Sequence, residues 1–171
     1  MSLTRRSALA AGALNNMRVT RNFARLVLVC GHGSQTANNP YASGLDCGAC
    51  GGHAGDVNAR IAAATLNDPE VRSRLAGQGL ALPVDTVFVA GLHNTTTDDV
   101  VLFDLDQVPD SHREDLAHLR EALGRAGSAA RRERAPSLGL ANLADDQIDA
   151  TVRARAVDIA GQPLKLGQQQ T

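Results

Sequence analysis

The sequence predicts an α/β fold, in which a mostly parallel sheet is flanked by helices. Three short apolar runs have the composition of buried strands, and they alternate with longer segments of helical spacing. Apolar residues make up 43% of the 171 residues, which is enough for a core, and this core must be aliphatic because the chain has no Trp. We expect one incomplete domain over residues 1–171, without internal repeats.

The first elements surround a long loop. Residues 4–24 have the pattern of a loosely amphipathic helix, and the run ARLVLVCG (24–31) is typical of a buried parallel strand that ends at glycine. A loop rich in Gly, Asn, Pro and Ser follows over 31–56. Loops of this length in compact domains are usually functional or disordered, so this loop is a candidate for a functional site.

The rest of the chain alternates in the same way. Helix signals include a cap-like Asp56 and the restart at Asp68-Pro69. Strand signals are continuous apolar runs. Further helices are predicted over 56–67, 69–75, 109–134 and 142–159, further strands over 85–93 and 99–106, and a polar tail over 161–171.

Composition excludes several functional classes. The net charge is −1, and no basic footprint of a nucleic-acid binder is present. Arg131, Arg132 and Arg134 are interrupted by Glu133 and predict a solvated helix face. No apolar run approaches the roughly 18–20 residues of a membrane span. Residues 1–16 resemble a short helix more than a signal peptide.

All three cysteines lie between residues 30 and 50. An odd count and the close spacing of Cys47 and Cys50 favour a reducing, cytoplasmic setting, with thiols reduced or bound to metal. Cys30 is predicted to be a buried strand residue.

The sequence does not match two hypotheses for this loop that involve no metal, a nucleophile elbow and a phosphate-binding loop. A nucleophile elbow around Ser34 would need glycine at positions 32 and 36, where the chain has His32 and Thr36. The segment GACGGHAG lacks the Lys and Ser/Thr of a phosphate-binding loop. His32 and His93 both follow strand-like runs, so both are candidates for one crevice at the carboxyl ends of the strands.

Metal binding is the stronger hypothesis. Thiolate and imidazole are zinc ligands, and the loop offers them at His32, Cys47, Cys50 and His53. From spacing alone, Cys47-x-x-Cys50 is half a zinc knuckle, a redox pair, or one ligand with a bystander. A redox pair requires a helix start, and Gly51-Gly52 argues against one. His53 otherwise reads as a solvated loop residue.

A second polar concentration, HNTTTDDV (93–100), follows the next strand. Its threonines are candidates for pocket hydroxyls, with Asp98 as a helix cap or a hydrogen-bond orienter. The alternative is an ordinary Ser/Thr turn.

Four segments of the chain resemble the DabA-type inorganic carbon transporter subunit family. They are NNMRVTRNFARLVLVCGHGS, NNPYASGLDCGACGG, GDVNARIAAATLNDPEVRSRL and LPVDTVFVAGLHNTTTDDV, in order over about residues 13–106. The helical region to about residue 160 is similar more loosely. The resemblance is to the C-terminal part of a much larger protein, so we expect the chain to be a fragment.

The resemblance implies a zinc centre similar to that of β-carbonic anhydrases, with two cysteines, a histidine and an aspartate. It places two ligands here, His32 in the GHGS motif and Cys47 in the LDCGACGG motif; Cys30, Cys50 and His53 are not ligands. Glycines 48, 51 and 52 would let the backbone close on the site.

The implied chemistry is hydration of CO2 to bicarbonate, made vectorial by a membrane subunit, DabB, which is similar to proton-conducting subunits of respiratory complexes. The soluble subunit would be peripheral on the cytoplasmic face of the cell inner membrane.

The chain departs from the family pattern because it has no Cys-x-Asp-x-Arg segment, which carries the other two ligands and an arginine. We therefore expect the chain alone to be inactive. The alternatives are a non-catalytic structural zinc or protein-binding module, and an inactive gene remnant.

Overall fold

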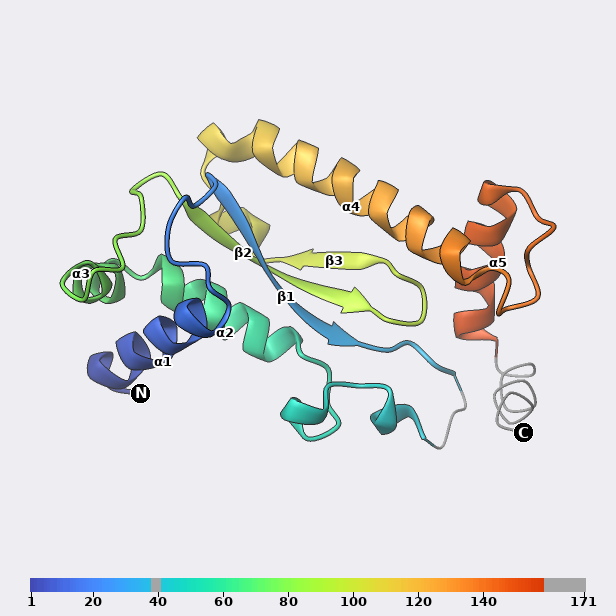
Figure 1. The fold of residues 1–171 in the computed structure, drawn as a ribbon, viewed down its shortest axis with the longest axis horizontal. Helices are drawn as coiled ribbons and strands as arrows, with labels where there is room; N and C mark the ends of the chain where they lie inside the picture. Colours follow the sequence, from blue (N-terminus) through green and yellow to red (C-terminus); the bar gives the residue numbers. More distant parts are fainter. Residues whose placement is uncertain (38–40, 159–171) are drawn as a thin grey trace. The chain divides into compact units, whose positions relative to one another are not determined.

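The computed structural model describes residues 1–37 and 41–158. Its sheet has the order β1-β2-β3, with β1 at Leu26–Gly33, β2 at Val87–Asn94 and β3 at Val100–Phe103. The N–H of Val87 donates to Arg25 O and the N–H of Thr95 to Gly33 O, a constant register that makes β1 and β2 parallel. β3 runs back beside β2 (Figure 1). The predicted α/β class, with helices around a mostly parallel sheet, is confirmed.

The helices largely begin and end where the capping signals predict. The second helix coincides with the predicted 56–67, and the Asp68 carboxylate accepts hydrogen bonds from the N–H groups of Glu70 and Val71 to start the third. The helices are α1 (Leu3–Asn16), α2 (Asp56–Asn67), α3 (Pro69–Ala76), α4 (Arg113–Arg134) and α5 (Asp145–Val157).

The first helix is shorter than the predicted 4–24. It ends at Asn16, and Arg18 and Asn22 both have a φ of 56°, in the left-handed region. Helical backbone cannot continue through such residues. The prediction was wrong here because the apolar spacing continues past the point where the backbone turns.

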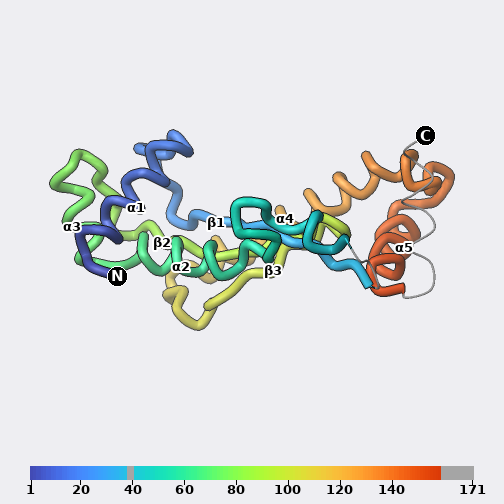
Figure 2. Tube along the Cα trace, turned by 90° about the horizontal axis from the view of Figure 1, so that it is seen from below, coloured from blue at the N-terminus to red at the C-terminus, as the bar shows by residue number. Residues whose placement is uncertain are grey.

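The described residues form two compact units. The first comprises residues 1–30, 56–91 and 102–117. In it α1, α2 and α3 pack against one another (Figure 2), around an aliphatic core that also receives Val27 and Val29 of β1. The core residues with the least exposure include Leu14, Leu66, Val71 and Leu75.

The second unit comprises residues 31–37, 41–55, 92–101 and 118–158 of the described chain. Its apolar cluster joins the end of α4 to α5 and contains Ala135, Leu140, Ile148 and Val152. This unit also holds the cysteine loop and the turn between β2 and β3. The predicted polar tail at 161–171 lies outside the described residues.

Candidate metal centre

The GHGS motif forms the end of β1, where a second backbone segment crosses closely. His32 is exposed, and its carbonyl accepts a hydrogen bond of 2.8 Å from the N–H of Gly55. A Cβ added at Gly31 would lie 2.3 Å from Gly55 O, and one at Gly33 would lie 3.0 Å from the Ala54 Cβ. These glycines therefore allow residues 53–55 to lie directly on the strand that carries His32.

The cysteine loop is tied to the same strand end by a side chain. Asp46 Oδ1 accepts hydrogen bonds from the Ser34 N–H at 2.7 Å and from the Ser34 hydroxyl at 3.0 Å. The N–H of Cys47 donates to His53 O at 3.2 Å in an isolated antiparallel bridge. The segments that carry His32 and Cys47 are thus joined through the neighbours of both residues.

Local structure favours the thiolate of Cys47. Cys47 precedes a single 3-10 turn, Gly48–Cys50. A hydrogen bond from the Cys50 side chain, assisted by the backbone N–H groups of Cys50 and Ala49, lowers the pKa of the Cys47 thiol against the opposing effect of desolvation. The thiolate is the form that binds metal. The local hydrogen bonds therefore prepare the Cys47 sulfur to act as a metal ligand.

The turn stops immediately after Cys50. Gly51 and Gly52 have φ angles of 68° and 79°, a conformation that favours glycine. The turn is thus too short to be the helix start that a redox pair requires, as the two glycines suggested. His53 is exposed, as predicted.

The prediction that Cys30 is buried was wrong, since Cys30 is exposed. β1 is an edge strand of the sheet, whereas a continuous apolar run predicts a strand covered on both faces. The sequence pattern does not reveal which strand of a sheet lies at its edge.

The segment after β2 is a tight turn. This agrees with the prediction of an ordinary Ser/Thr turn for residues 93–100. Asn94 Oδ1 accepts from the N–H groups of Thr96 and Thr97, and the Thr97 hydroxyl accepts from the N–H of Asp99. Asp98 caps no helix; it is buried, has a φ of 57°, and lies 3.2 Å from Nε2 of His93. Asp98 thus orients His93.

His32 and His93 are neighbours across the sheet. The register set by the Thr95–Gly33 hydrogen bond places His93 beside His32 on adjacent parallel strands, with both side chains on one face. This agrees with the expectation that the two histidines share the carboxyl end of the sheet.

Arg131 contradicts the prediction of a solvated helix face. It is 1% exposed, and its guanidinium donates to Thr97 O at 2.6 Å, to Asp149 Oδ1 at 2.6 Å and to Asp99 Oδ1 at 3.2 Å. The neighbouring Arg134 pairs with Asp98. The charge run gave no sign of this, because every acidic partner is distant in sequence.

Within residues 1–37 and 41–158, no three His, Cys, Asp or Glu side chains gather closely enough to hold a metal ion. Among the same residues, no helix has the length and apolar character needed to cross a bilayer.

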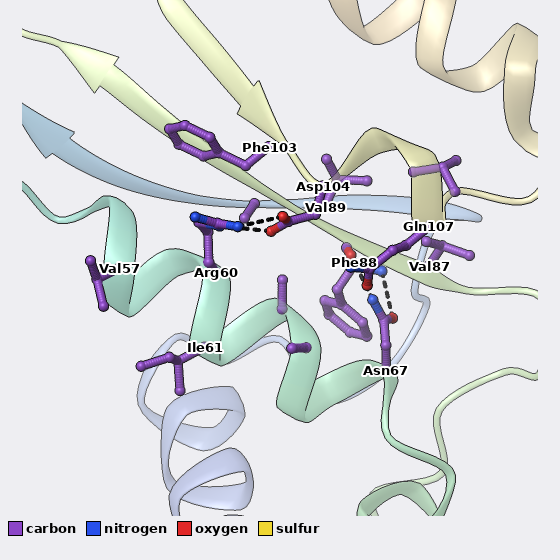
Figure 3. Close-up of a pocket in the computed structure, with 14 residues that line it drawn as sticks. Val57, Arg60, Ile61, Asn67, Val87, Phe88, Val89, Phe103, Asp104 and Gln107 are labelled. Atoms are coloured by element: carbon purple, nitrogen blue, oxygen red, sulfur yellow. Dashed lines mark hydrogen bonds and ion pairs between the residues drawn. The ribbon is translucent and has the colours of Figure 1, made fainter.

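A cavity of about 380 Å³ lies in the first unit, between α2 and the strands β2 and β3 (Figure 3). Three of its polar side chains are paired: Arg60 forms two hydrogen bonds with Asp104, at 2.8 and 2.6 Å, and Asn67 exchanges two with the backbone of Phe88. Arg60 also lies over the Phe103 ring. The two charged residues that line this cavity, Arg60 and Asp104, thus bind each other.

The close crossing at Gly31 predicts a large difference between two glycine substitutions. Gly31→Ala is expected to lower the free energy of unfolding by about 2 kcal/mol, because the new methyl group would overlap a backbone carbonyl. Gly48→Ala is the matched control, since a Cβ there meets no atom within 4 Å. Urea denaturation of both variants measures the difference. Equal unfolding midpoints for the two variants would contradict the close approach of Gly31 to the backbone of Gly55.

The comparisons with known proteins identify the family. The model of the family described as "Probable inorganic carbon transporter subunit DabA" matches residues 1–162. The chain belongs to the DabA family. Curated DabA subunits are similar over most of it: that of Chloroflexus aurantiacus is 56% identical over 92% of this chain, and that of Roseiflexus sp. is 55% identical over the same share. A DabA subunit of Bradyrhizobium sp. is 54% identical over 88% of the chain.

The chain spans about a fifth of these DabA relatives, 19% of the first and 18% of the last. No solved structure matches it.

Proposed function

We propose that this DabA chain carries two zinc ligands, His32 and Cys47, of a CO2-hydrating centre in an inorganic carbon uptake system. The observation that carries the proposal is the pair of ties between the ligand-bearing segments: Asp46 accepts two hydrogen bonds from Ser34, and Gly55 donates to His32 O. These bonds fix the backbone beside both donors before any metal binds, which lowers the cost of organising a site.

The donor set suits zinc. An imidazole and a thiolate of lowered pKa are ligands that zinc prefers, and they are two of the four that a tetrahedral site uses. The remaining ligands would come from outside the described residues. When bound, zinc lowers the pKa of a coordinated water, so that water chemistry proceeds near neutral pH.

The residues of this chain have separate tasks in the proposal. Cys50 and the backbone N–H groups of the 3-10 turn stabilise the Cys47 thiolate, so Cys50 is a positioning residue and not a ligand. Ser34 and Asp46 hold the loop on the strand, and Asp98 holds His93 beside His32.

CO2 and bicarbonate are the proposed substrates of the whole subunit. Its proposed partner is a membrane subunit, DabB, on the cytoplasmic face of the inner membrane.

A structural zinc site or protein-binding module is the second candidate. It is favoured by the position of the Cys50 and His53 donors, since Cys50 hydrogen-bonds Cys47 and His53 bridges to Cys47 through the backbone. In that case both cysteines would bind metal and CO2 would play no part.

Uptake of labelled bicarbonate by cells that express a full-length DabA subunit with its membrane partner tests the proposal. Substituting the counterpart of His32 by Ala or of Cys47 by Ser is expected to reduce uptake by about 100-fold or more, the usual scale for loss of an essential catalytic group. The counterpart of Cys50→Ser is the control and should retain most uptake. Retained uptake in the His32 and Cys47 variants, at equal protein levels, would contradict the proposed function.

A further inference from the structure

The strand β1 has the sequence of an interior strand but lies at the edge of the sheet. Residues Leu26–Cys30 read LVLVC, without a charge, a proline or a glycine. The order β1-β2-β3 leaves β1 with one neighbour among the described residues. Natural edge strands are usually short, or protected by charges, prolines or bulges, because an open apolar edge invites pairing with another strand.

The backbone register shows which groups face the open edge. The carbonyl of Arg25 accepts from Val87 at the start of β2, and that of Gly33 accepts from Thr95 just after its end. Odd-numbered residues of β1 therefore direct their hydrogen-bonding groups toward β2. The N–H and C=O groups of Leu26 and Leu28 therefore point away from β2. No described residue outside the strands hydrogen-bonds to the backbone of either leucine.

At the far end of β1, the outward-facing carbonyl of His32 is already satisfied by Gly55. The outer edge of β1 thus accepts hydrogen bonds from another segment where one is in reach. The unsatisfied part of the edge is at the beginning of the strand, around Leu26 and Leu28.

The opposite edge of the sheet is built differently. β3 has only four residues and is flanked by the acidic residues Asp99 and Asp104. Asp104 is held by Arg60, whose guanidinium lies over the Phe103 ring. Short length and charge at both ends are usual protections of a permanent edge, whereas β1 has eight residues and is flanked by a charge at one end only, Arg25.

We propose that, in the full DabA subunit, a β-strand from outside the matched region pairs with the outer edge of β1 along Leu26–Val29. Because the chain covers 19% of the first relative, about four-fifths of that subunit is available to supply the strand. An added strand would satisfy the backbone groups of Leu26 and Leu28, and its side chains would cover the exposed flank of the sheet. The pairing concerns Leu26–Val29 and involves neither of the proposed zinc ligands, His32 and Cys47.

Amide hydrogen exchange at residue resolution tests the pairing. In the 171-residue chain, the amides of Leu26 and Leu28 are expected to exchange about 100-fold faster than those of Val27 and Val29, which donate to β2. In a full-length DabA subunit, all four corresponding amides should be slow. Fast exchange at the two leucine positions of the full-length subunit would overturn the proposal. Equal protection of all four in the short chain, with a dimer seen by light scattering, would overturn it in favour of a second copy.

Proline substitutions give a second readout in the full-length subunit. Leu28→Pro removes an N–H that would bind the added strand, and Leu102→Pro removes an outward N–H from the β3 edge. The first is expected to lower the melting temperature clearly more than the second. Equal melting temperatures for the two variants would overturn the proposed pairing.

Discussion

Replacing Arg131 by Met is expected to lower the free energy of unfolding by about 3 kcal/mol, the scale for breaking a buried ion pair by removal of one partner. The Arg131 side chain is 1% exposed, and it binds Asp149, Asp99 and the carbonyl of Thr97. Met fills much of the same volume but cannot donate to Thr97 O or to Asp149 Oδ1, although Asp149 keeps its bond from Ser128 and Asp99 keeps those from Arg153. Urea denaturation, with the linear dependence of stability on denaturant, measures the loss.

The control is Arg132→Met, on the next residue of α4. The Arg132 side chain is 58% exposed and pairs with Asp145 at the surface, so its loss is expected to stay within about 0.5 kcal/mol. Equal losses from the two substitutions would contradict the buried role of Arg131.

The pH dependence of the stability lost in Arg131→Met shows the part played by Asp149, the partner of Arg131. The hydrogen bonds from Arg131 and then Ser128 lower the pKa of Asp149 from 3.8 to about 2. A lowered carboxyl pKa adds stability above the unfolded value, and this stability is lost as the pH falls through the folded value. The cost of Arg131→Met should therefore shrink between about pH 4 and pH 2.

Local signals predicted much of the fold. Asp68 and Pro69 were recognised as a cap and a first helical residue, and the structure starts α3 with them. The apolar runs at 24–31 and 85–93 became the parallel pair β1 and β2. These signals lie within a few residues of the element that they specify, so sequence alone reveals them.

The errors share a long-range cause. The exposure of Cys30 depends on β1 being an edge strand, and the burial of Arg131 depends on Asp149, which lies 18 residues away. Neither fact has a periodic signature in the sequence. A run of charges predicts a solvated face unless its partners are known.

The candidate site was predicted in part. The motifs that resemble the DabA family pointed to His32 and Cys47. The hydrogen bond from Ser34 to Asp46, which joins their two segments, spans 12 residues and follows no sequence spacing from which it could be predicted. The pairing of Asp98 with His93 was one of two roles predicted for that aspartate, and the structure shows it at 3.2 Å.

The second large effect concerns zinc. Zinc is expected to bind the 171-residue chain at micromolar strength or weaker, since a Kd of 1 μM corresponds to about −8 kcal/mol. A complete structural site contributes roughly 10–16 kcal/mol at neutral pH. With His32 and Cys47 as the only protein ligands, water must occupy the other positions. A full-length DabA subunit should bind zinc far more tightly and resist chelators.

The central claim is that Cys47 is a ligand and Cys50 supports it by hydrogen bonding. A competition titration with a chromogenic chelator tests this most directly, on the 171-residue chain and its Cys47→Ser and Cys50→Ser variants. We predict weak binding by the parent chain, a further loss of about tenfold or more in Cys47→Ser, and a much smaller change in Cys50→Ser. Nanomolar one-to-one binding by the parent chain, lost equally in both variants, would contradict the account and favour a local structural zinc site.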